Sequence, residues 1–144
     1  MDDYVGAKGA LFLGDSLLTT LRDDFPGLPW AGYWDFVGGG REPGETPRET
    51  LLREAREEVG LDLSGADWLW ESLFPAMIDP TRTSWFFVLR MPADAARGIV
   101  MGDEGQGWML LPPEQFLRLP RAVPSLQDRL RVWMAGLGEA RPRT

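Results

Sequence analysis

Hydrophobic residues along the chain occur in short runs that glycine, proline and aspartate separate. The runs at residues 8–13 and 17–21 flank a Gly-Asp-Ser turn at 14–16, which predicts a β-hairpin. Aromatic and β-branched residues at 33–37 predict another strand, which the glycines at 38–40 should end. By the same criteria, strands are expected at residues 68–74, 84–91 and 108–111, with a short one at 99–101 inside a loop spanning 92–104.

Other segments carry the marks of helices. The segment Thr46–Glu49 (Thr-Pro-Arg-Glu) has the form of a capping box, so we expect a helix over residues 47–59 that Gly60 ends. Residues 124–137 place apolar side chains on roughly one helix face, and a helical turn is expected at 113–117. Strands and helices mix without regular alternation. The pattern therefore predicts an α+β fold in which a mixed β-sheet lies between α-helices.

Length, composition and charge narrow the possible functions. The 144 residues fit a single domain over residues 1–144, with ends at 1–6 and 139–144 that we expect to be flexible. The chain has no cysteine and no histidine, which excludes disulfides, thiolate nucleophiles, cysteine-based zinc sites and a Ser-His-Asp triad. The net charge of -7 disfavours nucleic acid polymers and anionic membranes as partners. Its acidic first residues do not resemble a signal peptide, and we expect a cytoplasmic protein.

The first predicted helix has an unusual arrangement of charges. Glu54, Glu57 and Glu58 are three and four residues apart, so they cover an arc of roughly 100° directly beside the apolar side of the helix. Repulsion between the carboxylates costs about 0.2–0.5 kcal/mol for each such pair. A divalent cation bound between them would make the interaction favourable. A solvated helix face, with Arg53 and Arg56 neutralising the glutamates, is the alternative explanation. A glycine-rich turn precedes the helix and favours ligand binding, because such turns let backbone groups approach a metal or a phosphate closely.

One stretch of the sequence resembles a known family motif. Gly39, five residues, Glu45, seven residues and then Arg53–Leu61 (Arg-Glu-Ala-Arg-Glu-Glu-Val-Gly-Leu) look like the Nudix box. The one departure is Ala55, which stands where a larger aliphatic residue is usual. So many fixed residues at fixed spacing make this match far more specific than a lone glycine-rich loop.

The resemblance continues outside the box. Residues Trp34–Gly39 are similar to the strand that leads into the box, although Val37 replaces a common proline. Residues 102–108 resemble the loop that brings a further glutamate to the site in MutT-like members of the Nudix hydrolase superfamily. A Nudix fold is compatible with the chain from about residue 8 to residue 137.

The resemblance implies a reaction and a set of metal ligands. Nudix hydrolases cut a nucleoside diphosphate linked to a further group X, with divalent cations between the phosphates and the glutamates. It implies Mg²⁺ or Mn²⁺ held by Glu54, Glu57, Glu58 and the backbone carbonyl of Gly38. Glu104 is expected to bind metal or to deprotonate the attacking water. Glu54, Glu58 and Glu104 are therefore the expected catalytic carboxylates.

The resemblance also suggests supporting and substrate-binding residues. Arg53 is expected to be part of the catalytic set by pairing with Glu45 or Glu54 and fixing its rotamer. Asp103 competes with Glu104 for the role of the loop glutamate. The expected substrate-binding residues are Arg22, Asp35, Phe36 and Gly39. Alternative explanations are a surface position for Arg22 and a core position for the aromatic ring of Phe36.

Features outside the box bear on the substrate. Tyrosine occurs only at positions 4 and 33, so the downstream tyrosine associated with diadenosine polyphosphate hydrolases is missing. Asparagine is absent, so the asparagine with which MutT-type enzymes read 8-oxoguanine has no counterpart. A nucleoside triphosphate that yields a nucleoside monophosphate and pyrophosphate is our first choice. Pro75 lies near a proline typical of ADP-ribose hydrolases, so an ADP-ribose or nucleotide-sugar pyrophosphatase is the alternative.

Other classes fit the sequence less well. A non-catalytic nucleotide-binding Nudix module would usually lack box glutamates, all of which are present here. Isopentenyl diphosphate isomerase shares the fold but relies on a cysteine, which this chain lacks. A single ligand helix beside a glycine-rich loop does not resemble an EF-hand. We expect a small nucleotide as the partner, no nucleic acid polymer or membrane, and a monomer or a homodimer.

Overall fold

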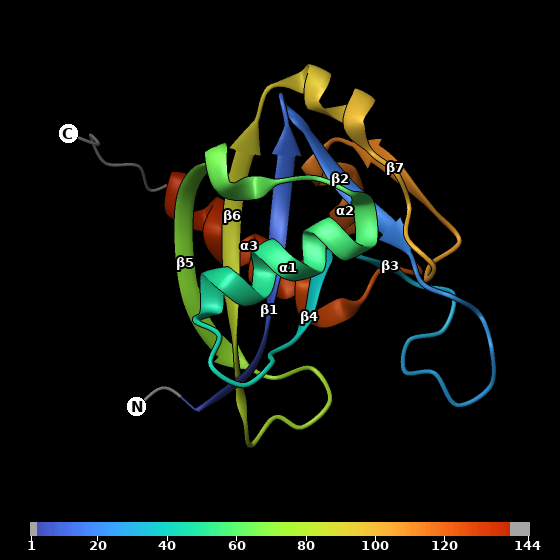
Figure 1. The fold of residues 1–144 in the computed structure, drawn as a ribbon, viewed down its shortest axis with the longest axis vertical. Coiled ribbons are helices and arrows are strands. Elements are labelled where there is room, and N and C mark those ends of the chain that lie inside the picture. Colours follow the sequence, from blue (N-terminus) through green and yellow to red (C-terminus); the bar gives the residue numbers. More distant parts are fainter. Residues whose placement is uncertain (1–2, 139–144) are drawn as a thin grey trace.

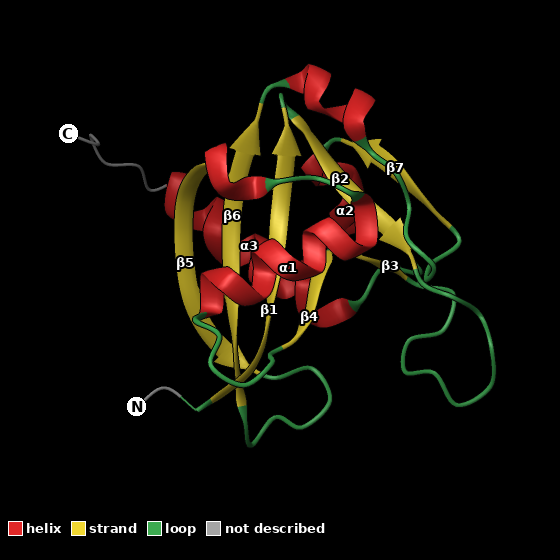
Figure 2. Ribbon diagram, viewed as in Figure 1, coloured by secondary structure: helices red, strands yellow, loops and turns green. Residues whose placement is uncertain are grey.

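A mixed β-sheet with helices on both faces makes up the structure, a computed structural model that describes residues 3–138 (Figures 1 and 2). The strands are β1 (Tyr4–Leu13), β2 (Ser16–Leu21), β3 (Trp34–Asp35), β4 (Val37–Gly40), β5 (Asp67–Pro75), β6 (Thr83–Met91) and β7 (Gly107–Leu111). The α-helices are α1 (Pro47–Val59), α2 (Pro113–Arg118) and α3 (Pro124–Gly138), and short 3₁₀ helices lie at Leu63–Gly65 and Ala93–Gly98. The predicted α+β fold is confirmed.

The sheet combines parallel and antiparallel pairing. Its main order is β3-β2-β1-β6-β5, with β4 also paired to β1 and β7 also paired to β2. Strands β1 and β6 run parallel, whereas the other paired strands run antiparallel. The long strand β1 therefore pairs with three other strands and lies in the middle of the sheet.

Neighbouring strand residues point to opposite faces of a sheet, and this alternation gives the molecule two hydrophobic cores. Leu11 and Leu13 of β1 pack in the core that includes Leu51 and Val59 of α1. Phe12, one residue away, packs in the core on the other face, to which α2 and α3 contribute. Figure 1 shows α1 crossing the front of the sheet and α3 lying behind it.

The segment predicted as one strand over 33–37 forms two short strands instead. The Asp35 carboxylate accepts a hydrogen bond from the backbone N–H of Phe36 at 2.7 Å, which takes that amide out of the ladder. Strand β4 then begins at Val37 and includes the glycines at 38–40, which were expected to end the strand. These glycines pair with β1, with Gly38 opposite Lys8.

Three further expectations are corrected. No strand forms at 99–101, because the N–H of Val100 donates to the carbonyl of Val59 at the end of α1, at 2.9 Å. Within the expected loop over 92–104, residues 93–98 form a 3₁₀ helix. The flexible end expected over residues 1–6 is shorter than predicted, since β1 begins at Tyr4. Residues 1–2 and 139–144 lie outside the described residues. None of the helices in residues 3–138 combines the length and the hydropathy of a membrane span.

Candidate active site

Helix α1 is fixed at both ends by its own sequence. The Thr46 hydroxyl accepts a hydrogen bond from the N–H of Glu49 at 3.2 Å, and the Glu49 carboxylate accepts one from the N–H of Thr46 at 2.9 Å. At the other end Gly60 has a left-handed φ of 72°, and its N–H donates to the carbonyl of Arg56 at 3.1 Å. The predicted capping box and helix bounds are confirmed. These bonds fix which way the glutamates of the helix face.

Two glycines of β4 bring the sheet against the carboxylates of α1. Gly38 has a φ of 133°, and a Cβ there would lie 2.1 Å from the carbonyl oxygen of Ala7. A Cβ at Gly39 would lie 2.7 Å from the carboxyl carbon of Glu54. The N–H of Gly38 donates to Glu58 Oε1 at 3.2 Å. Glycine at position 38 therefore lets β4 pack against β1, and glycine at position 39 leaves room for the Glu54 carboxylate.

Glu58 is a buried carboxyl group with a strongly shifted pKa. Burial raises the pKa of Glu58 to about 8, against the opposing charge of Lys8 and together with the neighbouring Glu54. Two carboxyl groups side by side offer hard oxygen donors, and a divalent cation between them would remove their repulsion. The residues present therefore fit Mg²⁺ or Mn²⁺.

Lys8 is the only lysine of the chain, and it lies beside Glu54 and Glu58. Its Nζ donates to Asp35 Oδ2 at 3.0 Å, to the carbonyl of Phe36 at 3.2 Å and to the carbonyl of Gly38 at 3.1 Å. The carbonyl that the Nudix resemblance assigns to a metal thus accepts from Lys8 in this structure. A fixed positive charge lies next to the buried Glu58.

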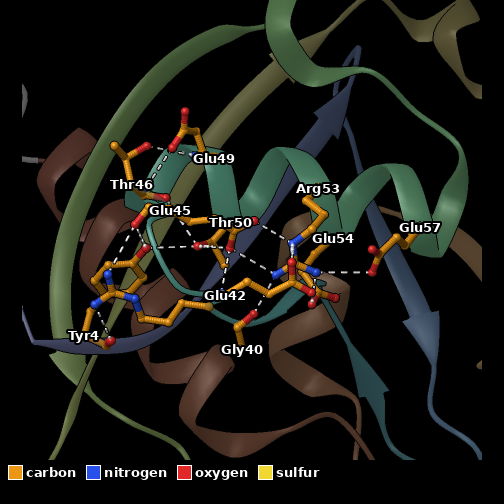
Figure 3. Close-up of polar contacts among 11 residues, drawn as sticks. Tyr4, Gly40, Glu42, Glu45, Thr46, Glu49, Thr50, Arg53, Glu54 and Glu57 are labelled. Atoms are coloured by element: carbon orange, nitrogen blue, oxygen red, sulfur yellow. Dashed lines mark hydrogen bonds and ion pairs between the residues drawn. The ribbon is translucent and has the colours of Figure 1, made fainter.

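Arg53 gathers acidic groups on the other side of Glu54 (Figure 3). We call Arg53, Glu45, Glu54, Glu57 and the carbonyl of Gly40 the Arg53 cluster. The guanidinium lies 2.6 Å from Glu45, 3.0 Å from Glu54 and 3.3 Å from Glu57, and it donates to the Gly40 carbonyl at 2.7 Å. Its hydrogen bond lowers the pKa of Glu45 to about 2. Arg53 therefore pairs with both of the partners that the sequence suggested, and it orients Glu54.

Glu57 lies apart from the other two helix glutamates. Its side chain is 58% exposed, reaches toward Arg53 and does not line the cleft described below. Across residues 3–138, no three acidic side chains lie close enough together to form a ready-made metal cluster. The structure brings Glu54 and Glu58 together and leaves Glu57 outside.

A cleft of about 700 Å³ opens beside Glu54 and Glu58, which are both half-buried. The predicted site residues that line it are Arg22, Asp35, Gly38, Gly39, Glu54, Glu58 and Glu104. Asp103, the competitor of Glu104, is exposed and does not line the cleft. The loop that carries Glu104 is tied to the end of β2, because Gln106 Nε2 donates to the carbonyl of Arg22 at 2.7 Å.

Asp35 and Phe36 have different environments from those expected of substrate contacts. Asp35 is buried and accepts from Lys8 at 3.0 Å and from Arg22 at 2.8 Å, so it holds two cations at the cleft wall. Phe36 is fully buried and stacks on Phe116 with ring centroids 4.6 Å apart. The expectation that Phe36 contacts the substrate is therefore corrected: its ring belongs to the core.

The comparison with protein families agrees with this geometry. The family described as NUDIX domain matches residues 6–133, which include every residue of the site discussed so far. The chain belongs to the Nudix family. It is a MutT-like Nudix hydrolase, and enzymes of this family act on small nucleotide substrates.

Relatives of this Nudix hydrolase include several nucleotide-cleaving enzymes. It is 44% identical over 112 residues to the CTP pyrophosphohydrolase of Escherichia coli (strain K12), covering 78% of each chain. It is 33% identical over 110 residues to the nucleoside triphosphatase NudI of Salmonella arizonae, covering 72% of this chain and 77% of that one. A match of 52% identity to the 8-oxo-dGTP diphosphatase of Proteus vulgaris covers 33 residues, 23% of this chain and 30% of that protein.

A solved structure supports the fold. The MutT protein from Methanosarcina mazei Go1 superposes with a TM-score of 0.70 at 19% identity, over 93% of this chain and 95% of that one. At this level of identity the likeness concerns the fold alone.

Sequence reasoning missed two residues of this Nudix site. Lys8 is held at the cleft wall, and the available signal was a single charged residue in an otherwise small and apolar strand. Gln106 anchors the loop of Glu104, and nothing local in the sequence marks it for that role. Both depend on contacts between segments that are far apart in the chain.

Proposed function

We propose that this Nudix hydrolase cuts a nucleoside triphosphate into a nucleoside monophosphate and pyrophosphate, with Mg²⁺ or Mn²⁺ bound at Glu54 and Glu58. The observation that carries the proposal is that the half-buried pair Glu54 and Glu58 shares its cleft with Lys8 and Arg22. Carboxylates alone would repel a polyphosphate, whereas a cleft with both signs of charge accommodates a cation and an anion together. The relatives that cleave CTP and nucleoside triphosphates support this choice of substrate.

Each residue of the cleft has a part in this proposal. A bound divalent cation would offset phosphate charge and lower the pKa of the attacking water. Glu54 and Glu58 would hold it, and Arg53 keeps Glu54 in place through their 3.0 Å ion pair. Arg22 lines the cleft and would offset part of the remaining phosphate charge. Glu104 reaches the cleft from its loop and is our candidate to accept the proton of the water.

Product identity tests the reaction. The purified chain is incubated with Mg²⁺ and a panel of nucleoside triphosphates, ADP-ribose, nucleotide sugars and dinucleotides. We expect a nucleoside monophosphate and pyrophosphate from one or more triphosphates. Two monophosphates from ADP-ribose or a nucleotide sugar, with the triphosphates left intact, would replace the proposal with the alternative pyrophosphatase. The same assays in size-defined fractions show whether the active species is a monomer or a homodimer.

A matched pair of variants tests the role of Glu104. Glu104→Gln and Asp103→Asn each remove one exposed charge from the same loop, but only Glu104 lines the cleft. We expect Glu104→Gln to lower kcat by about 10²-fold or more, in the range for a lost acid-base group, and Asp103→Asn to have little effect. Equal effects of the two changes would show that the loop acts through its charge alone.

A further inference from the structure

The loop between β2 and β3 carries large apolar side chains into the cleft. Phe25 is 52% exposed and Trp30 is 37% exposed, and both line the cleft that holds Glu54 and Glu58. Single exposed hydrophobic residues are common on protein surfaces and need no explanation. Two aromatic rings of one loop at the mouth of the catalytic cleft are a more specific arrangement.

The backbone of Trp30 adds a second observation. Its φ of 54° is left-handed, and it is the one residue other than glycine with a positive φ between residues 3 and 138. A bulky residue takes this conformation only where its surroundings hold it, and such strain gathers at ligand sites. The loop does hold it: Arg22 Nε donates to the carbonyl of Pro29 at 3.0 Å, and the N–H of Tyr33 donates to the carbonyl of Trp30 at 3.1 Å. The Trp30 ring also meets the ring of Tyr33 edge-on at 5.2 Å.

The loop between β5 and β6 brings more apolar surface to the same cleft. It contributes Met77 and Ile78, and Ile78 is 69% exposed. Both loops project from the lower part of the molecule in Figure 1. The cleft therefore has a charged part at Glu54, Glu58 and Lys8 and an apolar part supplied by two loops. With a divalent cation bound at Glu54 and Glu58, a ligand that matches both parts has a polyanionic end and a flat apolar end.

We propose that the base of the nucleotide substrate stacks on the indole ring of Trp30, with Phe25 and Ile78 as the apolar surface around it. This inference rests on the proposed function, because it takes the polyanionic end to be the triphosphate. It also supplies a base-binding surface in place of Phe36, whose ring is buried. A stacking surface contacts the π-face that every base shares, so we expect several bases to be accepted.

Variants at position 30 separate the ring from the backbone. Trp30→Ala removes the ring, Trp30→Phe keeps an aromatic face, and Trp30→Gly removes the ring while relaxing the left-handed backbone. Trp108→Ala is the matched control, because Trp108 is 39% exposed and does not line the cleft. Two ligands separate the base from the phosphate: cytidine 5′-monophosphate and ribose 5-phosphate, which lacks only the base. Binding is measured by calorimetry, and kcat/KM is measured with CTP.

The expected result is specific to the base. Trp30→Ala and Trp30→Gly should weaken binding of cytidine 5′-monophosphate by about 10-fold or more and lower kcat/KM for CTP by a similar factor, as lost base stacking predicts. Binding of ribose 5-phosphate should not change, Trp30→Phe should retain most of the affinity, and Trp108→Ala should match the wild type. Trp30→Gly should unfold at the same or a higher temperature than the wild type, because it removes strain.

Other outcomes overturn the inference, and they differ from failure of the proposed function. Unchanged binding of cytidine 5′-monophosphate to Trp30→Ala, or equal loss in Trp30→Ala and Trp30→Phe, would show that the ring does not stack on the base. Equal weakening for ribose 5-phosphate would show a general effect on the loop. If the wild type hydrolyses no triphosphate, the proposed function fails, while the two-ligand comparison still decides whether Trp30 binds a base.

Discussion

Glu45, in the loop before α1, and Glu58, near the end of α1, have pKa values that move in opposite directions. Glu45 is held by Arg53 at 2.6 Å, and this hydrogen bond lowers its pKa to about 2. Burial raises the pKa of Glu58 to about 8, although the positive charge of Lys8 opposes the rise. The protein stabilises the charged form of Glu45 and disfavours the charged form of Glu58.

This difference distinguishes the residues of the motif that hold the loop and helix together from those that face the cleft. The Arg53 cluster satisfies its acidic groups with a guanidinium and fixes the loop before α1 to the helix and to the Gly40 carbonyl. On the cleft side, Glu54 keeps its ion pair with Arg53 at 3.0 Å, whereas Lys8 is the positive charge that acts on Glu58. Strongly perturbed acids in a cleft are typical of functional sites. The Nudix box thus combines an ion-pair cluster around Arg53 with Glu58, a carboxyl group whose charged form the protein disfavours.

The largest expected effect is that of Glu58→Gln on turnover. Removing the charge should lower kcat by at least about 10²-fold, in the range for a lost acid-base or metal-binding group. Steady-state assays with Mg²⁺ and a nucleoside triphosphate measure it, and Glu114→Gln, an exposed change on α2, is the control. Near-normal turnover of Glu58→Gln would refute the site.

In the absence of divalent cations, Glu58→Gln should make the fold more stable than the wild type as the pH rises. The folded pKa of Glu58 is about 8, above its ordinary value of 4.5, so folding favours the protonated acid. Its stabilising contribution is full below pH 4.5 and is lost as the pH rises through about 8. Glutamine carries no proton to lose. Thermal unfolding with a chelator should therefore show a decline with pH for the wild type and a flatter profile for Glu58→Gln.

Glu45→Gln should mainly reduce stability. It removes charged hydrogen bonds from Arg53, which costs about 1.5–3 kcal/mol where such bonds are largely shielded from solvent. Because the folded pKa of Glu45 is lowered, its contribution is present above pH 4.5 and is lost as the pH falls toward about 2. Urea unfolding at neutral and acidic pH measures both effects. Glu71→Gln, which breaks the exposed ion pair with Arg48, is the control and should change stability little.

Local signals explain what could be predicted from the sequence. The bounds of α1 were predicted correctly because Thr46, Glu49 and Gly60 act on their own neighbours. The box glutamates could be predicted as site residues because the motif is contiguous in the sequence. The strand predicted at 33–37 is divided into two, because the N–H of Phe36 donates to the Asp35 carboxylate instead of to a neighbouring strand.

Contacts between distant segments explain what the sequence could not show. Lys8 meets the site because β1 pairs with β4 in a register that places Lys8 opposite Gly38. Residues 99–101 have the composition of a strand, but the amide of Val100 bonds to the end of α1. Trp30 was not singled out, because its left-handed backbone and its place at the cleft follow from the fold of the loop.

Arg22→Ala is expected to act on substrate binding more than on turnover. Arg22 bonds to Asp35 at 2.8 Å and to the Pro29 carbonyl at 3.0 Å, so its loss removes a cation from the cleft and loosens the loop of Trp30. KM should rise by about 10-fold, the equivalent of one charged hydrogen bond, with a smaller change in kcat. Arg22→Lys should recover part of the effect, because it restores the charge without the forked donors. An unchanged KM for all good substrates would exclude the role.

Glu57→Gln is expected to have the smallest effect on kcat. It tests most directly whether Glu57 belongs to the Arg53 cluster or to the metal site. Its carboxylate is 58% exposed and is paired with Arg53 at 3.3 Å, and exposed ion pairs of this kind contribute about 0–1 kcal/mol. If Glu57 belongs to the Arg53 cluster alone, kcat should fall by less than about 10-fold, and the Mg²⁺ concentration for half-maximal activity should not change. A metal ligand would behave differently: Glu57→Gln would then approach Glu58→Gln in kcat and would need more Mg²⁺. That result would mean that Glu57 leaves Arg53 when a cation binds, so that a member of the compensated cluster joins the carboxyl pair of the cleft.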